Sequence, residues 1–177
     1  MKKVVIISTS LRSGSNSEAI AEAVAKGARE AGNDVTVISL KNKNLAFCKG
    51  CMACQKLDKC VIKDDANDIT DAICSSDVVV WATPIYYYSV SGSMKTMIDR
   101  ANSLYTRDYK FREVYLVATA ADDAENAVDG AKKCVQGWID CLEKVESFKT
   151  FFAGGIENSN SVPTDILNEA CDLGNGI

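Results

Sequence analysis

Residues 3–32 read KVVIISTSLRSGSNSEAIAEAVAKGAREAG, and this stretch decides the fold. The run Lys3–Thr9 is apolar and β-branched at consecutive positions, which favours a strand buried on both faces. Residues 17–32 then predict an amphipathic helix that ends at Gly32. Its apolar stripe consists of Ile20, Val24, Ala28 and Ala31. The chain therefore opens with a strand, a polar loop and a helix.

The same alternation continues along the rest of the chain. We expect strands at Asp34–Leu40, Asp77–Thr83, Glu113–Ala120 and Phe148–Ala153, and helices at residues 66–75, 91–105, 124–146 and Pro163–Leu173. This pattern predicts one α/β domain over residues 1–177, with a doubly wound parallel sheet of five strands and helices on both faces. Ligands of such sheets bind at the carboxyl ends of the strands. The segments after the first, third and fourth strands are therefore the candidate sites.

Composition narrows the function classes. The 177 residues carry a net charge of −4, which argues against nucleic acid as a partner. The chain contains no histidine, which excludes Ser-His-Asp and Cys-His catalysis and histidine metal sites. The apolar run near Met1 is too short for a signal peptide or a membrane span, so we expect a cytoplasmic protein without a membrane partner.

The polar stretch after the first strand, residues 8–17, offers hydroxyl groups, an arginine and an asparagine at the start of a helix. Hydroxyl donors, loop N–H groups and the helix dipole together suit a monophosphate dianion. Ser15 and Glu18 also match a capping box, and a cap is compatible with phosphate binding. Neither a GxGxxG fingerprint nor a P-loop is present.

Aromatic residues follow the third strand. Residues 83–91 read Thr-Pro-Ile-Tyr-Tyr-Tyr-Ser-Val-Ser, and Pro84 predicts a turn where the strand ends. Consecutive tyrosines at a strand end offer a flat, amphipathic surface to a ring system such as isoalloxazine. The alternative is an aromatic hinge that packs on the next helix. After the fourth strand, the small residues of 119–122 would let the backbone approach a ring edge.

A cysteine cluster lies in the loop at residues 46–65. Its four members are Cys48, Cys51, Cys54 and Cys60. Soft thiolate ligands at this spacing suit an iron–sulfur centre or zinc, and free or redox-active thiols are the remaining alternative. Asp64 and Asp65 fit a helix N-cap better than a ligand role. The other cysteines are expected to be small buried hydrophobic residues: Cys74, Cys134, Cys141 and Cys171.

Charge is uneven around this loop. Residues 41–65 hold six lysines against three aspartates, and residues 111–177 hold five basic against twelve acidic side chains. The lysines are suited to stabilise an anionic four-thiolate cluster or to dock an acidic electron partner, and solvated loop lysines are the simpler explanation.

Taken together, these motifs resemble the flavodoxin-like NADPH-dependent FMN reductases. The resemblance rests on the serine-rich loop at 8–17, on Thr-Pro-Ile-Tyr at 83–86 and on Lys95, Asp99 and Arg100 in the following helix. The cysteine spacing, followed by Asp64-Asp65, resembles the iron–sulfur flavoprotein branch of that family. The family resemblance implies the strand order 2-1-3-4-5. Lys95, Asp99 and Arg100 would serve helix surface pairing or a subunit interface.

The resemblance also implies the cofactor and its ligands. FMN phosphate would be held around Ser10, Arg12, Ser15, Asn16 and Ser17, and isoalloxazine would lie against Pro84, Ile85, Tyr86, Tyr87, Thr119 and Ala120. A [4Fe–4S] cluster would bind the four loop cysteines. No protein side chain is expected to be catalytic, because the flavin carries the chemistry.

We therefore expect an oxidoreductase that passes electrons from NAD(P)H or a reduced protein donor to a quinone, a flavin or another small acceptor. A ferredoxin-like protein is a possible partner, and a homodimer or homotetramer is implied, in which the cysteine loop faces a neighbour's flavin. Two alternatives stay open. One is a non-enzymatic flavodoxin-like electron carrier, and the other is a cysteine-rich domain that senses metals or redox state.

Overall fold

The computed structural model describes all 177 residues and contains a single sheet. Its five strands run parallel in the order β2-β1-β3-β4-β5. Their bounds are β1 Lys3–Ser8, β2 Asp34–Ser39, β3 Val78–Pro84, β4 Glu113–Thr119 and β5 Ser147–Ala153. The predicted flavodoxin-like fold and strand order are confirmed.

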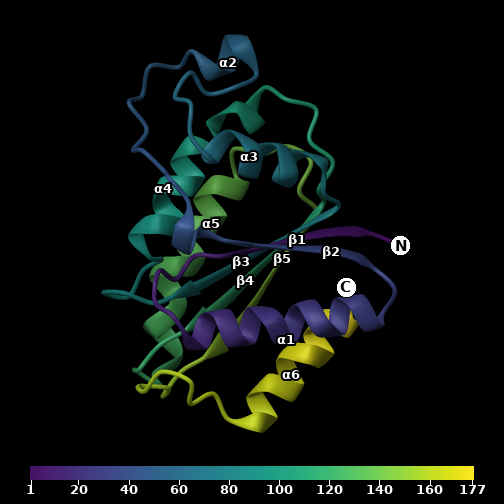
Figure 1. The fold of residues 1–177 in the computed structure, drawn as a ribbon, viewed down its shortest axis with the longest axis vertical. Helices are drawn as coiled ribbons and strands as arrows, with labels where there is room; N and C mark the ends of the chain where they lie inside the picture. Colours follow the sequence, from purple (N-terminus) through teal and green to yellow (C-terminus); the bar gives the residue numbers. More distant parts are fainter.

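Helices cover both faces of the sheet (Figure 1). Helices α1 (Asn16–Glu30) and α6 (Thr164–Asn175) pack against one face, and α3 (Ala66–Ser75), α4 (Gly92–Arg100) and α5 (Asp129–Ile139) cover the other. A short helix, α2 (Cys54–Leu57), lies outside these layers in the cysteine-rich loop. Three 3₁₀ turns complete the structure: η1 (Leu40–Asn42), η2 (Asn102–Tyr105) and η3 (Glu125–Val128).

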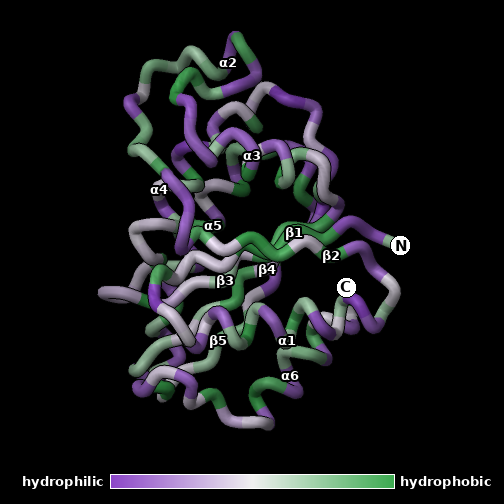
Figure 2. The backbone as a smooth tube through the Cα atoms, viewed as in Figure 1, coloured by the Kyte–Doolittle hydropathy of each residue, from purple (hydrophilic) through white to green (hydrophobic).

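The core follows from the apolar strands. Val4 to Ile7 of β1 and Val78 to Ala82 of β3 are almost fully buried, because each strand contacts helices on both faces. Figure 2 shows this hydrophobic band along the middle of the sheet. The edge strand β2 is only partly buried. No helix is both long and apolar enough to cross a membrane.

The predicted helix at 124–146 is too long. It consists of η3 and α5, and α5 ends at Ile139. The backbone N–H groups of Glu146 and Ser147 both donate to Arg112 O at the edge of β4, so the chain must leave the helix early to start β5. Leu142 is apolar and still buried, although it is not helical. The hydrophobic pattern of residues 124–146 therefore predicted the burial of Leu142 correctly but overestimated the length of the helix.

The predicted helix at 91–105 is also divided. α4 ends at Arg100, and η2 starts at Asn102. This break tightens the last turn and turns the Asn102 side chain toward the cysteine loop.

Candidate functional site

The loops after β1, β3 and β4 meet at one edge of the sheet and are joined by hydrogen bonds. Thr9 Oγ1 donates to Ala82 O at 2.9 Å and lies 3.0 Å from Ser91 Oγ. The N–H of Ile85 donates to Thr119 O at 2.7 Å. The predicted binding segments of residues 8–17, 83–91 and 119–122 therefore form one continuous surface.

The serine-rich loop offers a row of free backbone donors at the start of α1. Ser15 is the N-cap, and its Oγ accepts from the N–H of Glu18 at 3.2 Å. None of the backbone N–H groups of residues 13–17 has an acceptor within the chain. The hydroxyl-bearing residues Ser10, Ser15 and Ser17 are buried beside them. Successive free N–H groups at a helix N-terminus are suited to a phosphate dianion, so these residues fit the phosphate group of FMN.

A segment between β5 and α6 covers this loop, and the sequence did not reveal it. Asn16 Nδ2 donates to Asn158 O at 2.7 Å and to Ile156 O at 3.4 Å. The N–H of Asn160 donates to Gly14 O at 3.2 Å, and Arg12 donates to Ser159 Oγ. We call residues 156–161 the strap. It engages the side chains of Arg12 and Asn16, whose role as phosphate ligands stays a prediction.

A second basic group at the loop was also missed. Lys41 in η1 donates its Nζ to Ser13 Oγ, which brings an ammonium group to the serine-rich loop from the end of β2. Parallel strands β1 and β2 are neighbours, so their carboxyl ends deliver Ser13 and Lys41 to the same place. Only the strand order predicts this meeting, because the two residues lie 28 positions apart.

The tyrosines form an exposed hairpin. The N–H of Tyr86 donates to Ser89 O at 3.0 Å, and the N–H of Ser89 returns a bond to Tyr86 O at 3.1 Å. Tyr87 and Tyr88 both have positive φ, 49° and 61°. Two successive bulky residues in the left-handed region are strained, and such strain occurs mainly at functional sites. Tyr87 is fully exposed, so its ring does not pack on a helix.

The hairpin is held by its backbone and by one side-chain contact. A Cβ at Gly130 would lie 2.1 Å from Tyr88 O, so only glycine lets α5 start this close to the turn. Tyr88 Oη donates to Asp122 Oδ2 at 3.0 Å, and this hydrogen bond raises the pKa of Tyr88. The hairpin and the segment after β4 are thus in contact, and the placement of isoalloxazine against them stays a prediction. Thr119 and Ala120, at the start of that segment, are buried.

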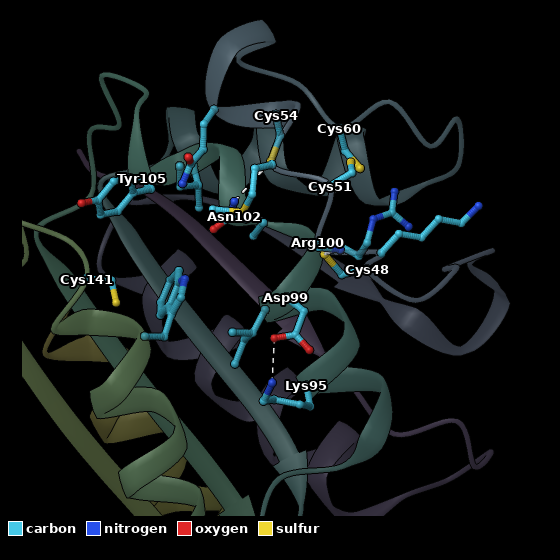
Figure 3. Close-up of a pocket in the computed structure, with 18 of the residues that line it drawn as sticks. Cys48, Cys51, Cys54, Cys60, Lys95, Asp99, Arg100, Asn102, Tyr105 and Cys141 are labelled. Carbon is cyan, nitrogen blue, oxygen red and sulfur yellow. Dashed lines mark hydrogen bonds and ion pairs between the residues drawn. The ribbon is translucent and has the colours of Figure 1, made fainter.

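The cysteine loop lies over α3 and α4, away from this edge (Figure 1). Cys48, Cys51, Cys54 and Cys60 all line one cavity of about 670 Å³. Figure 3 draws these cysteines together with Tyr105 and Cys141 around the cavity. Cys54 is buried, and Cys48 and Cys51 are exposed. No three Cys, Asp or Glu side chains are gathered at metal-ligand geometry. The donor set consists of thiols, which fits an iron–sulfur or zinc group.

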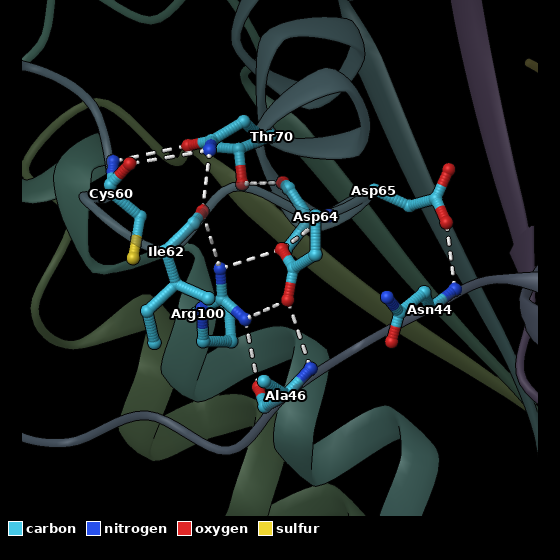
Figure 4. A network of polar contacts seen from close by, with 10 residues as sticks. Asn44, Ala46, Cys60, Ile62, Asp64, Asp65, Thr70 and Arg100 are labelled. Atoms are coloured by element: carbon cyan, nitrogen blue, oxygen red, sulfur yellow. Dashed lines mark hydrogen bonds and ion pairs between the residues drawn. The ribbon is translucent and has the colours of Figure 1, made fainter.

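A buried ion pair closes the base of this loop (Figure 4). Arg100 donates to Asp64 at 2.5 and 2.7 Å, and their side chains are 0% and 2% exposed. Arg100 also donates to Ala46 O at 2.7 Å and to Ile62 O at 3.3 Å. Both ends of the loop are therefore fastened to α4. The expectation of a surface role for Arg100 is wrong, whereas Lys95 and Asp99 do form an exposed pair.

We call the contacts of Arg100 with Asp64, Ala46 and Ile62 the clamp, and Asp64 lies at its centre. Burial raises the pKa of its carboxyl, but the hydrogen bonds from Arg100 and from the N–H groups of Ala46 and Ala66 outweigh that effect and hold the pKa below its ordinary value. Conversely, the hydrogen bonds to Asp64 raise the pKa of Arg100. Asp65 occupies the N-cap position of α3 without a capping bond, and its Oδ2 accepts from the N–H of Asn44 at 2.6 Å. The predicted N-cap position of Asp65 is confirmed, but the side chain that accepts from the first turn is that of Asp64, at 3.2 Å from the N–H of Ala66.

The remaining four cysteines differ in burial, and Cys171 on α6 is half-buried. Cys74 is buried as expected, and burial raises the pKa of its thiol. Cys134 is half-buried, and burial also raises its pKa. Cys141 is exposed, contrary to the expectation, because α5 has ended before it and the residue lies outside the packed face. Cys134 and Cys141 both line the cavity shared by the loop cysteines.

Comparison with solved structures supports the fold. An NAD(P)H:quinone oxidoreductase from Methanothermobacter marburgensis matches with a TM-score of 0.75 and 16% identity over 98% of both chains. An azoreductase from Bacillus anthracis matches with a TM-score of 0.74 and 18% identity over 100% of both chains. At such identities the likeness concerns the fold alone.

Comparison of sequences gives the family. The iron–sulfur flavoprotein of Methanosarcina thermophila is 30% identical over 140 residues, which are 79% of this chain and 72% of that protein. One from Archaeoglobus fulgidus is 33% identical over 100 residues, which are 56% of this chain and 45% of that protein. The chain thus aligns with less than half of the Archaeoglobus relative. The model of the family described as NADPH-dependent FMN reductase matches residues 2–142. The predicted family is confirmed: this chain belongs to the NADPH-dependent FMN reductases, an oxidoreductase family, with iron–sulfur flavoproteins among its relatives.

Proposed function

We propose that the chain binds FMN at the carboxyl edge of the sheet and passes electrons from NAD(P)H or a reduced protein donor to a small acceptor such as a quinone or a second flavin. The observation that carries this proposal is the row of free N–H groups at residues 13–17 beside the exposed tyrosine hairpin. One feature suits a phosphate and the other suits a planar ring, and they lie on one surface.

Each part of this edge has a role toward the cofactor. The free N–H groups and the hydroxyls of Ser10 and Ser17 would bind phosphate, with Lys41 adding positive charge. The hairpin backbone packs closely against Gly130 at the start of α5, and this contact would hold the tyrosines at the border of the ring. FMN would supply the exchange of electrons between two-electron and one-electron partners. The chain would hold it and orient it.

We further propose that Cys48, Cys51, Cys54 and Cys60 hold a [4Fe–4S] cluster. Support comes from four thiols on one cavity, from the lysine-rich surroundings and from the names of the relatives in Methanosarcina and Archaeoglobus, which are iron–sulfur flavoproteins. Four thiolates carry negative charge, which Lys49 on the same cavity would help to offset. Structural zinc and free thiols are the alternatives that metal analysis separates.

Exposed apolar side chains on the cysteine loop favour a protein partner. Phe47 is 80% exposed, and Met52, Leu57 and Val61 are also exposed. Apolar side chains interleaved with lysines suit an acidic protein that exchanges electrons, such as a ferredoxin. The same surface and the tyrosine hairpin are suited to contacts with a second copy, so we propose a homodimer or homotetramer.

The test is iron, acid-labile sulfide and FMN per chain, measured on protein purified without oxygen. We expect FMN with about four irons and four sulfides, and NAD(P)H oxidation in the presence of a quinone. The variant Cys51→Ser should lose iron and keep FMN, because the two sites lie on different parts of the molecule. Cys171→Ser is the matched control, since Cys171 lies on α6 outside the cavity.

The alternatives give different results. If the purified chain contained FMN but no iron, the proposed cluster would be wrong and the proposed flavin reductase would remain. Slow NAD(P)H oxidation beside fast exchange with a ferredoxin would indicate an electron carrier. A colourless chain that does not bind added FMN would overturn the proposal and favour a cysteine-rich sensor.

A further inference from the structure

The side chain of Asn102 contacts one cysteine of the loop directly. Asn102 is the first residue of η2, immediately after α4, and its Nδ2 donates to Cys54 Sγ at 3.3 Å (Figure 3). This is the only side-chain hydrogen bond of Asn102. Cys54 is 8% exposed and is the most buried of the four loop cysteines.

The short helix α2 contacts η2 at its start and, through the residue after its end, contacts Thr106, the residue that follows η2. Cys54 begins α2 and accepts the Asn102 bond, and Asp58 follows its last residue. Asp58 Oδ1 accepts from Thr106 Oγ1 at 3.4 Å. A helix of four residues is too short to be stable alone, so these contacts with η2 determine where Cys54 lies.

The clamp at Arg100 fixes the same segment from the other side. Arg100 holds Ala46 and Asp64 at the base of the loop, and Asn102 lies two residues further along the chain. Arg100 is the last residue of α4, which packs in the core through Met94 and Met97, and Asn102 is the first residue of η2. The junction of α4 and η2 therefore presents one donor to the base of the loop and another to Cys54.

We propose that Asn102 is a positioning residue for the cysteine site: it holds Cys54 in place before the other three cysteines close around the metal, and its N–H···S bond raises the reduction potential of the cluster. This rests on the proposed cluster. The physical reason is charge. The reduced cluster is more negative than the oxidised one, so an N–H donor at a ligand sulfur stabilises the reduced form more.

The experiment compares Asn102→Ala and Asn102→Leu with the wild type. Alanine removes the side chain, and leucine keeps its bulk without a donor. Asn168→Ala, at an exposed position on α6, is the matched control.

The first measurement is hydrogen exchange in the metal-free chain at the amides of Lys56 and Leu57, which donate to Ala53 O within α2. We expect exchange about twofold to tenfold faster in both Asn102 variants, the factor for one lost hydrogen bond, and no change in the control.

The second measurement is the reduction potential of the anaerobically reconstituted protein, followed by electron paramagnetic resonance. We expect a lower potential in both Asn102 variants, with a change of up to about tenfold in the one-electron equilibrium constant, about 59 mV. FMN content should not change.

Each outcome decides the proposal. Unchanged exchange in both variants would overturn the anchoring role. Faster exchange with an unchanged potential would overturn the donor role and leave Asn102 as a structural anchor. If the wild-type chain takes up no iron and sulfide, the proposed cluster fails, and exchange at α2 alone then decides whether Asn102 positions Cys54.

Discussion

Removing the charge of Asp64 should destabilise the whole chain. In Asp64→Asn the side chain keeps its shape, but Arg100 loses the carboxylate that accepts its bonds at 2.5 and 2.7 Å. The guanidinium is 0% exposed, so water cannot replace the lost partner. Breaking a buried ion pair on one side costs about 3–5 kcal/mol. In a chain of this size the melting temperature should fall by roughly 6–20 °C.

The assay is urea and thermal unfolding followed by circular dichroism. The matched control is Asp99→Asn on the same helix, where the pair with Lys95 is 53% and 44% exposed and the expected loss is about 0–1 kcal/mol. Asp64→Asn combined with Arg100→Met should recover part of the loss, because the unpaired buried charge is the costly state. A loss for Asp64→Asn no larger than that for Asp99→Asn would refute the reasoning.

The stability that Asp64 contributes to the folded chain should decrease as the pH falls. The pKa of Asp64 is lower in the folded chain than in the unfolded chain, where it is about 3.9. Its stabilisation is therefore complete above about pH 5 and is lost as pH falls through the folded pKa. The stability difference between the wild type and Asp64→Asn should shrink below about pH 4 and stay constant from pH 6 to 8.

Two further predictions concern α1, one near its end and one at its start. Gly27→Ala would place a Cβ 1.9 Å from Cys171 O and push α6 away from α1, so denaturant unfolding should show a free energy of unfolding lower by about 1–3 kcal/mol. Gly137→Ala is the control, because the space around Gly137 is open and the substitution should cost no stability. Equal stabilities of the two variants would contradict this prediction. Asn16→Ala should weaken FMN binding by releasing the strap from the serine-rich loop, measured as flavin retained after dilution and dialysis; unchanged retention would remove Asn16 from the site.

The sheet was predictable because its strands are unusually uniform. Residues such as Val78 to Trp81 are apolar without alternation, and only strands covered on both faces show this pattern. The cap at Ser15 was also predictable, because its hydrogen bond reaches only three residues along the chain. Local signals therefore placed the start of α1 correctly.

The strap, the clamp and the Asn102 contact were not predictable, because each joins distant segments. Asn16 meets Asn158 across 142 residues, and Asn102 meets Cys54 across 48. Arg100 was misjudged for a specific reason. A charged residue on a helix usually faces water, and nothing in the helical pattern of 91–105 shows that the loop of residues 46–65 covers it.

The clamp also connects the two proposed sites within one small domain. Ser91, the N-cap of α4, is buried at the carboxyl edge of the sheet, where its Oγ lies 3.0 Å from Thr9 Oγ1 and accepts from the N–H of Met94. It ends at Arg100, which holds the base of the cysteine loop. The nine residues of α4 rise about 1.5 Å each, so one rigid element of about 13–14 Å connects the two sites. Because side chains fix this helix at both ends, the core of the protein positions the cysteine loop relative to the carboxyl edge of the sheet, although the residues of the loop are largely exposed.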